Sequence, residues 1–326
     1  MTVSFRNLAA RRETGVAVLL GLTVAVVAGL NPAFVSGANI RDMLVQCAPA
    51  AIVGCGLTFV LLTGEIDISL GSMMGFLAAV MGLATSSQYG NLPAPAGIAI
   101  TLAAGTAIGL LNGVLVSVGR VPSIIVTLGM LTALRGLTEL IMGGKWISGI
   151  PPGLRYLGTG TVIGVPISIW VAAVTVVLAW LFARETPAGR RIYALGSNPK
   201  AAVLAGLSPT RIKLFVFALT GFLVAVATLV GTTQLSVIES GIGVGFEMVV
   251  VTSVVVGGAS INGGKGTILG MLLGVILLGI VRTVLIFLNL GETSVYWERA
   301  IQGAFILVAV LMDHLASRRK SAEVPT

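Results

Sequence analysis

Long apolar runs separated by short polar segments make up most of this 326-residue chain. A helix of about 20 apolar residues crosses the ~30 Å hydrocarbon core of a bilayer. The runs are continuous and lack the period-two alternation of a transmembrane barrel, so they predict an all-α polytopic membrane protein. Ten membrane helices are expected, at residues 15–31, 44–63, 70–87, 94–118, 122–142, 162–183, 213–236, 247–258, 266–289 and 297–315.

Composition extends this pattern to the whole chain. Hydrophobic residues make up 56% of it and charged residues only 10%, with a mean hydropathy of +1.03. About a quarter of a soluble domain is charged. We therefore expect one transmembrane domain at residues 15–315, between an N-terminal tail at 1–14 and a C-terminal tail at 316–326.

Membrane topology explains the net charge of +8, which therefore does not indicate a nucleic-acid partner. With a cytoplasmic N-terminus, the predicted spans place 14 basic residues on the cytoplasmic side. The other side receives three, namely Arg41, Lys145 and Arg155. Lys and Arg accumulate in cytoplasmic loops, so the count predicts that both termini are cytoplasmic.

The predicted span at 247–258 is too short for a full crossing. Short, glycine-interrupted segments often mark broken helices that line a pathway. An internal similarity supports this interpretation, because residues 63–72 and 257–266 both follow an apolar run and carry polar residues between glycines at a helix start. These features favour short or broken helices and a duplicated-half arrangement.

The polar segment at residues 184–213 differs most from its apolar surroundings and holds six of the 20 basic residues. Within it, Asn198 is a favourable N-cap, Pro199 suits the first helical position and Gly206 suits the helix exit. These signals predict a short surface helix at residues 199–205. A Ser-Pro pair then predicts the start of the next membrane helix, so motion of the short helix can pass directly into the membrane.

Two carboxylates, Glu65 and Asp67, follow the second predicted span. Carboxylates inside a membrane are expensive and usually functional, so an ion or proton site is one interpretation. Alternatively, they lie at a membrane boundary, where Asp67 or Ser69 caps the next helix. We favour capping and loop shaping, because the pair need not lie inside the membrane and side chains spaced i, i+2 do not share a helix face.

Charged residues inside the predicted spans are further candidates for function. Arg135 and Glu139 are spaced i, i+4, and they either neutralise each other or line a polar translocation path. Arg282 has no evident partner nearby in the sequence. It is expected to face a cavity or a partner subunit.

No pattern in the sequence indicates catalysis, a metal site or a bound cofactor. Around Lys265 the phosphate-loop pattern G-x-x-x-x-G-K-[ST] fails, because Ala259 and Gly266 stand where Gly and Ser or Thr are required. The chain has a single histidine, and no paired, spaced carboxylates occur in a polar domain. We therefore expect a protein without enzymatic activity.

Three motifs carry a resemblance to a known family. The pattern G-G-I-D-L-S-x-G-S matches residues 64–72, with Glu65 in place of the second glycine. The pattern G-x-N-x-x-A-A-x-x-x-G is matched by Gly196, Asn198, Ala201, Ala202 and Gly206. The pattern G-G-x-S-x-x-G-G-x-G is matched by Gly257, Gly258, Ser260, Gly263, Gly264 and Gly266. Over essentially its full length, the chain resembles permease subunits of bacterial ABC importers for ribose-type sugars and the autoinducer-2 signal. The glutamate form of the first motif resembles the rhamnose-type and autoinducer-2-type members.

The resemblance implies a subunit of the bacterial inner membrane that dimerises, with an identical or a paralogous permease, around a central pathway. The other implied partners are ABC ATP-binding subunits, which bind the ATP, a periplasmic solute-binding protein and membrane lipid. The implied solute is a pentose, a deoxyhexose such as rhamnose, or autoinducer-2.

Two sets of candidate residues follow from the motifs and the charges. The implied ATPase-docking (coupling) helix comprises Gly196, Asn198, Pro199, Ala201, Ala202 and Gly206. The candidates for the translocation pathway and its gating are Glu65, Asp67, Ser69, Arg135, Glu139, Ser260 and Asn262. The alternatives are an ion-coupled secondary transporter that uses Glu65 or Asp67, and a related ABC permease for branched-chain amino acids or nucleosides.

Overall fold

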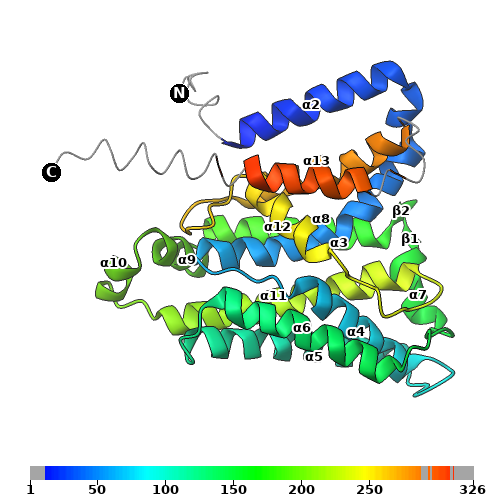
Figure 1. The fold of residues 1–326 in the computed structure, drawn as a ribbon, viewed down its shortest axis with the longest axis horizontal. Helices are drawn as coiled ribbons and strands as arrows, with labels where there is room; N and C mark the ends of the chain where they lie inside the picture. Colours follow the sequence, from blue (N-terminus) through cyan, green and yellow to red (C-terminus); the bar gives the residue numbers. More distant parts are fainter. Residues whose placement is uncertain (1–11, 288–292, 294–295, 309–310, 312–326) are drawn as a thin grey trace.

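The computed structural model describes residues 12–287, 293, 296–308 and 311. Its long helices lie side by side along one axis of the molecule (Figure 1). In chain order the elements are α2 (Arg12–Leu30), η1 (Pro32–Val35), α3 (Gly37–Leu62), α4 (Leu70–Thr85), α5 (Ala94–Ser117), α6 (Ser123–Met142), α7 (Pro152–Thr159), β1 (Thr161–Val162), β2 (Val165–Pro166), α8 (Ile167–Glu185), α9 (Pro187–Ser197), α10 (Pro199–Leu204), α11 (Pro209–Gly231), η2 (Thr232–Gln234), α12 (Phe246–Val256) and α13 (Ile268–Phe287). The prediction of an all-α polytopic membrane protein is confirmed.

Seven of the described helices are long and apolar enough to cross a membrane, namely α2, α3, α5, α6, α8, α11 and α13. Within the described residues, a helix occupies each of the nine predicted spans between residues 15 and 289. The span predicted from residue 162 begins only at Ile167, because β1 and β2 pair in an antiparallel hairpin just before it. The span predicted at 297–315 lies partly outside the described residues. Its described part, from residue 297 to 308, is helical. Most of the two predicted tails also lies outside the described residues.

The two ends of the helix bundle carry different elements (Figure 1). We call the end with α9 and α10 the α9–α10 face, and the end with α7, β1 and β2 the hairpin face. α2 starts at the α9–α10 face, since the Glu13 carboxylate accepts a hydrogen bond there from the Thr267 hydroxyl. Both loops that resemble each other in sequence, residues 63–69 and 257–267, also begin at this face.

The core is centred on α3, which is far more deeply buried than the peripheral helix α2. α11 packs most extensively against α5 and next against α3. Glycines allow the close approach of α5 and α11, because a Cβ on Gly109 would overlap the Phe217 carbonyl and one on Gly221 would overlap the Gly105 carbonyl. Such small-residue contacts are the usual basis of helix packing in lipid.

Two short helices, α4 and α12, do not cross the bundle. Their 16 and 11 residues span about 24 Å and 16 Å, less than the ~30 Å of a bilayer core. Gly71, in the first turn of α4, lies directly against the Gly243 carbonyl in the segment that precedes α12. Both helices therefore begin next to each other inside the bundle (Figure 1). The predicted broken helices are confirmed, whereas the duplicated-half arrangement stays a prediction.

Candidate functional site

Three consecutive helices at the α9–α10 face start in the same way. α9, α10 and α11 each have proline at the first position, preceded by Thr186, Asn198 and Ser208 as N-caps. Each cap side chain accepts a hydrogen bond from the backbone N–H three residues further on, at 3.0 Å for Thr186 and Asn198 and 3.5 Å for Ser208. The predicted short helix is α10, and its Asn198 cap is confirmed. α9 was not predicted, although Thr186-Pro187 carries the same signal.

α9 is fixed to the loops that follow α3 and α12. A Cβ on Gly196 would overlap the Leu62 carbonyl and come within 2.5 Å of the Gly264 amide nitrogen. The Tyr193 hydroxyl donates a hydrogen bond of 2.9 Å to the Gly266 carbonyl. Burial and the nearby Glu13 carboxylate both raise the Tyr193 pKa, which keeps the phenol protonated as a donor. α9 is therefore held against both loops.

α10 exposes an apolar surface that sequence reasoning missed. Leu204 is 89% exposed and Val203 is 52% exposed, whereas the predicted docking residue Ala202 is buried against the protein itself. Ala201 and Pro199 are exposed, and Gly206 adopts a left-handed φ of +80° just beyond the helix. The sequence located the helix, but only the fold shows which of its faces is free.

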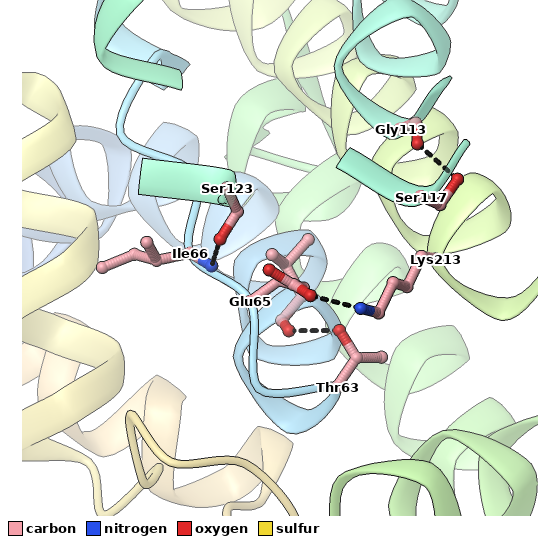
Figure 2. A network of polar contacts seen from close by, with 8 residues as sticks. Thr63, Glu65, Ile66, Gly113, Ser117, Ser123 and Lys213 are labelled. Carbon is pink, nitrogen blue, oxygen red and sulfur yellow. Dashed lines mark hydrogen bonds and ion pairs between the residues drawn. The ribbon is translucent and has the colours of Figure 1, made fainter. Parts of the chain in front are cut away.

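Glu65 forms an ion pair with Lys213, the fifth residue of α11 (Figure 2). Their side chains are only 15% and 24% exposed, so each charge is neutralised where solvent is scarce. The next residue, Ile66, donates its backbone N–H to the Ser123 hydroxyl at 3.1 Å, also visible in Figure 2. Residues 63–69 are thus attached to the starts of both α6 and α11.

Asp67 lies in a buried polar cluster with Ser69 and Asn112, all three fully inaccessible. Its Oδ1 accepts hydrogen bonds from the Ser69 backbone N–H at 2.8 Å and from the Ser69 hydroxyl at 2.6 Å. Asn112 Nδ2 donates to the Ser69 hydroxyl at 3.1 Å and lies 3.5 Å from Asp67 Oδ2. Loop shaping by Asp67 is confirmed. Capping of α4 is wrong, because the Ser69 hydroxyl is engaged by Asp67 and makes no cap hydrogen bond.

Ser260 and Asn262 lie in the loop after α12, at the α9–α10 face. The buried Ser260 hydroxyl accepts a hydrogen bond of 3.3 Å from the Asn262 backbone N–H, while the Asn262 side chain is exposed. A Cβ on Gly64 would approach the Asn262 carbonyl to 3.7 Å. The backbone of Asn262 therefore lies against the loop of residues 63–69, and Ser260 is buried two residues before it.

Arg135 does not neutralise Glu139. Its guanidinium donates hydrogen bonds to the carbonyls of Ser240 at 2.8 Å and Ile242 at 3.0 Å, and Glu139 is exposed one turn further along α6. The spacing permits an intrahelical pair, but two unpaired carbonyls in the segment before α12 compete successfully for the arginine. Arg135 thus fixes the segment that returns into the bundle.

A cavity of about 780 Å³ lies at the start of α12. Its polar lining consists of Glu247, Arg282, Glu298, Arg299 and Gln302. The prediction that Arg282 faces a cavity is confirmed, and its partner is the Glu298 carboxylate at 4.0 Å. Glu247, Glu298 and Gln302 were missed. The shortness of the span at 247–258 was a sequence signal for Glu247, and Glu298 stands as a charged residue inside the predicted span at 297–315.

Taken together, the geometry is that of a multi-pass membrane protein with a short helix that exposes apolar side chains at one end and an open cavity lined by charged and apolar side chains at the start of α12. Its residues 39–310 match the family described as the permease component of branched-chain amino acid transport systems. The chain belongs to this family of transport permeases.

Individual relatives are similar to the chain over most of its length. The ribose import permease of Haemophilus influenzae is 38% identical over 286 residues, covering 86% of this chain and 87% of the relative. The ribose import permease of Bacillus subtilis is 35% identical, covering 87% and 86%. The autoinducer-2 import system permease of Yersinia pseudotuberculosis is 34% identical, covering 92% and 84%. No solved structure matches the chain.

Proposed function

We propose that this chain is the membrane-spanning permease subunit of an ATP-driven importer for a small sugar or sugar-like solute. One observation carries the proposal: the chain is similar over 86% of its length to a ribose import permease, and a comparable similarity extends to an autoinducer-2 permease. A pentose, a deoxyhexose such as rhamnose, and autoinducer-2 are the solutes considered.

The family description and the individual relatives name different solutes. The description names branched-chain amino acids, whereas the relatives above are named for ribose and autoinducer-2. We give more weight to the relatives, because each aligns with most of this chain at 34% identity or more, while the description covers a whole family. The glutamate at position 65 agrees with the sugar-type members that the motif resembles.

The α9–α10 face is assigned to the cytoplasm and to the ATP-binding subunit. Residues 184–213 hold six basic residues, and basic residues accumulate on the cytoplasmic side. Leu204, exposed on α10, supplies an apolar anchor of the kind that stabilises interfaces. Both termini then lie in the cytoplasm. ATP binds to the partner subunit, and this chain needs no catalytic group of its own.

The opposite end and the sides of the bundle are assigned to the remaining partners. The hairpin face is assigned to the periplasm and to the solute-binding protein. The exposed apolar helices are assigned to inner-membrane lipid and to a second permease, identical or paralogous.

One observation favours an ion-coupled secondary transporter as a second candidate. α4 and α12 begin beside each other inside the bundle, and such half-helices form the ion and substrate sites of many secondary transporters. The Glu65–Lys213 pair weakens this alternative, since it neutralises one of the two carboxylates on which ion coupling was expected to depend.

Reconstitution separates these functions. Proteoliposomes contain this chain with its ATP-binding subunit and its solute-binding protein, and the uptake of radiolabelled D-ribose is measured. We expect uptake only with ATP on the side of the ATP-binding subunit, and competition by unlabelled D-ribose but not by L-leucine. Uptake by the chain alone, driven by a sodium or proton gradient, would replace the permease proposal with the secondary transporter.

A further inference from the structure

We propose that the cavity at the start of α12 is a solute-contact site for a neutral polyhydroxylated molecule on its way through the membrane. The inference rests on the proposed import function and assigns to it a particular set of residues. They are Glu247, Arg282, Glu298, Arg299 and Gln302.

The lining is balanced in charge and mixed in hydrogen-bonding capacity. Two carboxylates, Glu247 and Glu298, face two guanidinium groups, Arg282 and Arg299, so the site has no net charge with which to select an ion. Carboxylates accept hydrogen bonds, guanidinium groups donate them, and Gln302 does both. Neighbouring hydroxyl groups, each a donor and an acceptor, match such a lining better than an ion or an apolar side chain does.

The size and the apolar part of the lining agree with the same ligand class. Sites for small molecules occupy roughly 300–1,000 Å³, and this cavity of about 780 Å³ lies within that range. Phe246 and Met74 also line it, and they provide apolar surface for the C–H groups of a sugar ring. An aldopentose and its hydration water fit this combination.

The position of the cavity follows from the two half-length helices. Glu247 lies in the first turn of α12, where the positive end of the helix dipole favours a carboxylate. Its Oε2 is buried without a hydrogen-bond partner and lies so close to Gly71 that a Cβ there would overlap it. The start of α4 therefore holds Glu247 in place at the wall of the cavity.

Arg135 has a supporting role as a positioning residue. The segment of residues 243–245 forms part of the cavity wall, and Arg135 binds the carbonyls of Ser240 and Ile242 directly before it. The wall is thus held by a side chain that does not line the cavity.

Protection from chemical labelling tests contact with the solute. Gln302→Cys is introduced into the complete importer in proteoliposomes, where the native Cys47 and Cys55 are buried and do not compete. The rate of modification by a small water-soluble thiol reagent is measured with D-ribose or with L-leucine. We expect D-ribose, during turnover with ATP, to slow the reaction severalfold and L-leucine to leave it unchanged.

Uptake by charge-neutral variants tests the same residues independently. Loss of a hydrogen bond to a charged group is expected to raise the half-saturation concentration for D-ribose about tenfold in Glu247→Gln and in Arg282→Gln. Arg41→Gln and Asp42→Asn, which remove an exposed ion pair of 3.7 Å outside the cavity, are the matched controls and should transport as the wild type does.

The outcomes separate this inference from the proposed function. Suppose that the wild type takes up D-ribose with ATP, that D-ribose does not slow the labelling of Gln302→Cys, and that both cavity variants transport with wild-type kinetics. These results would overturn the solute site and leave the proposed permease function standing. Protection by L-leucine in place of D-ribose also overturns it, because the site then selects an amino acid. Uptake by the wild type that requires no ATP overturns the proposed function instead.

Discussion

Glu65 forms an ion pair with Lys213 and so joins the loop after α3 to the N-terminal part of α11 (Figure 2). The loop of residues 63–69 leads directly into α4, and α11 begins just after the exposed α10. One electrostatic contact therefore couples the surface assigned to the ATPase with the half-length helix at the centre of the bundle. A glycine at position 65 provides no such contact.

The Glu65–Lys213 pair is expected to stabilise the fold. Glu65→Gln and Lys213→Met should each lower the free energy of unfolding by about 1–3 kcal/mol, because each leaves a partly buried charge without its partner. The double variant should lose less than the sum of the two, with a coupling of about 0.5–3 kcal/mol. Thermal unfolding in detergent micelles measures the stability of the wild type, the two single variants and the double variant. The same cycle on the exposed Arg41–Asp42 pair should give less than about 1 kcal/mol, and equal couplings for the two cycles would contradict the prediction.

Arg135 is expected to fix the segment before α12. Arg135→Gln should accelerate amide hydrogen exchange in residues 236–245, and it should destabilise the protein by about 1–3 kcal/mol, because two carbonyls lose a charged donor. Exchange is read by mass spectrometry of the peptide that covers this segment. Glu139→Gln, one turn along α6, is the control and should leave exchange unchanged. Unchanged exchange in Arg135→Gln, with faster exchange in Glu139→Gln, would contradict this prediction and support an intrahelical Arg135–Glu139 pair instead.

Tyr193 should make the protein sensitive to alkaline pH. Its folded-state pKa is raised above the ordinary value of about 10, so its contribution to stability is complete below about pH 10 and is lost as the pH rises through the folded-state value. Tyr193→Phe should cost about 0.5–1.5 kcal/mol at neutral pH through loss of the hydrogen bond to Gly266. The difference from the wild type should shrink as the pH rises above about 10.

Thermal unfolding of both proteins between about pH 7 and pH 11 measures this difference. Tyr156→Phe on the hairpin face, where the hydroxyl lies 3.4 Å from the Thr161 carbonyl and is exposed, is the matched control. A difference for Tyr193→Phe that stays constant with pH would show that its phenol does not titrate in this range.

Leu204 is expected to anchor the ATP-binding subunit. Burial of a leucine side chain in an interface is worth about 1.5–3 kcal/mol, so Leu204→Ser should weaken co-purification of the ATP-binding subunit by about tenfold or more. Folding should be unaffected, because the side chain is 89% exposed. Ile163→Ser, a change of similar size at a residue that is 90% exposed on the hairpin face, should leave co-purification intact. Equal retention of the ATP-binding subunit by both variants would remove α10 from the interface.

The contact between α5 and α11 should not tolerate a methyl group. Gly221→Ala places a Cβ against the Gly105 carbonyl, and overpacking of this kind costs about 1–3 kcal/mol. Gly129→Ala in α6 meets open space and should be neutral or stabilising by up to about 1 kcal/mol. Thermal midpoints of the two variants in detergent provide the comparison. Two equal midpoints would mean that the α5–α11 backbones can separate without cost.

The local parts of this protein could be predicted because their causes lie within a few residues. The positions of the membrane helices follow from runs of apolar residues, and the start of α10 follows from the Asn198-Pro199 pair, which satisfies its own backbone. α9 could have been predicted from Thr186-Pro187 on the same grounds. The half-length of α12 was visible as an apolar run too short to cross a bilayer.

The predictions that were wrong involve polar or charged side chains with several possible partners. Arg135 is four residues from Glu139 yet binds carbonyls 105 and 107 residues away. Ser69 stands at the N-cap of α4, but Asp67 occupies its hydroxyl. In each case local spacing allowed one contact, and the packing of distant segments supplied a stronger one.

The sequence by itself determined that this chain crosses a membrane many times, that it carries a capped helix in its most polar segment, and that its motifs are those of import permeases. Only the tertiary structure decided that Glu65 meets Lys213, that Val203 and Leu204 are exposed on α10, and that Glu247, Arg282 and Gln302 surround one cavity. The physical reason is the separation along the chain over which each interaction acts. Hydropathy and capping act within a single helix, whereas the partner of a charge depends on which distant segments the packed bundle brings within a few ångströms of it.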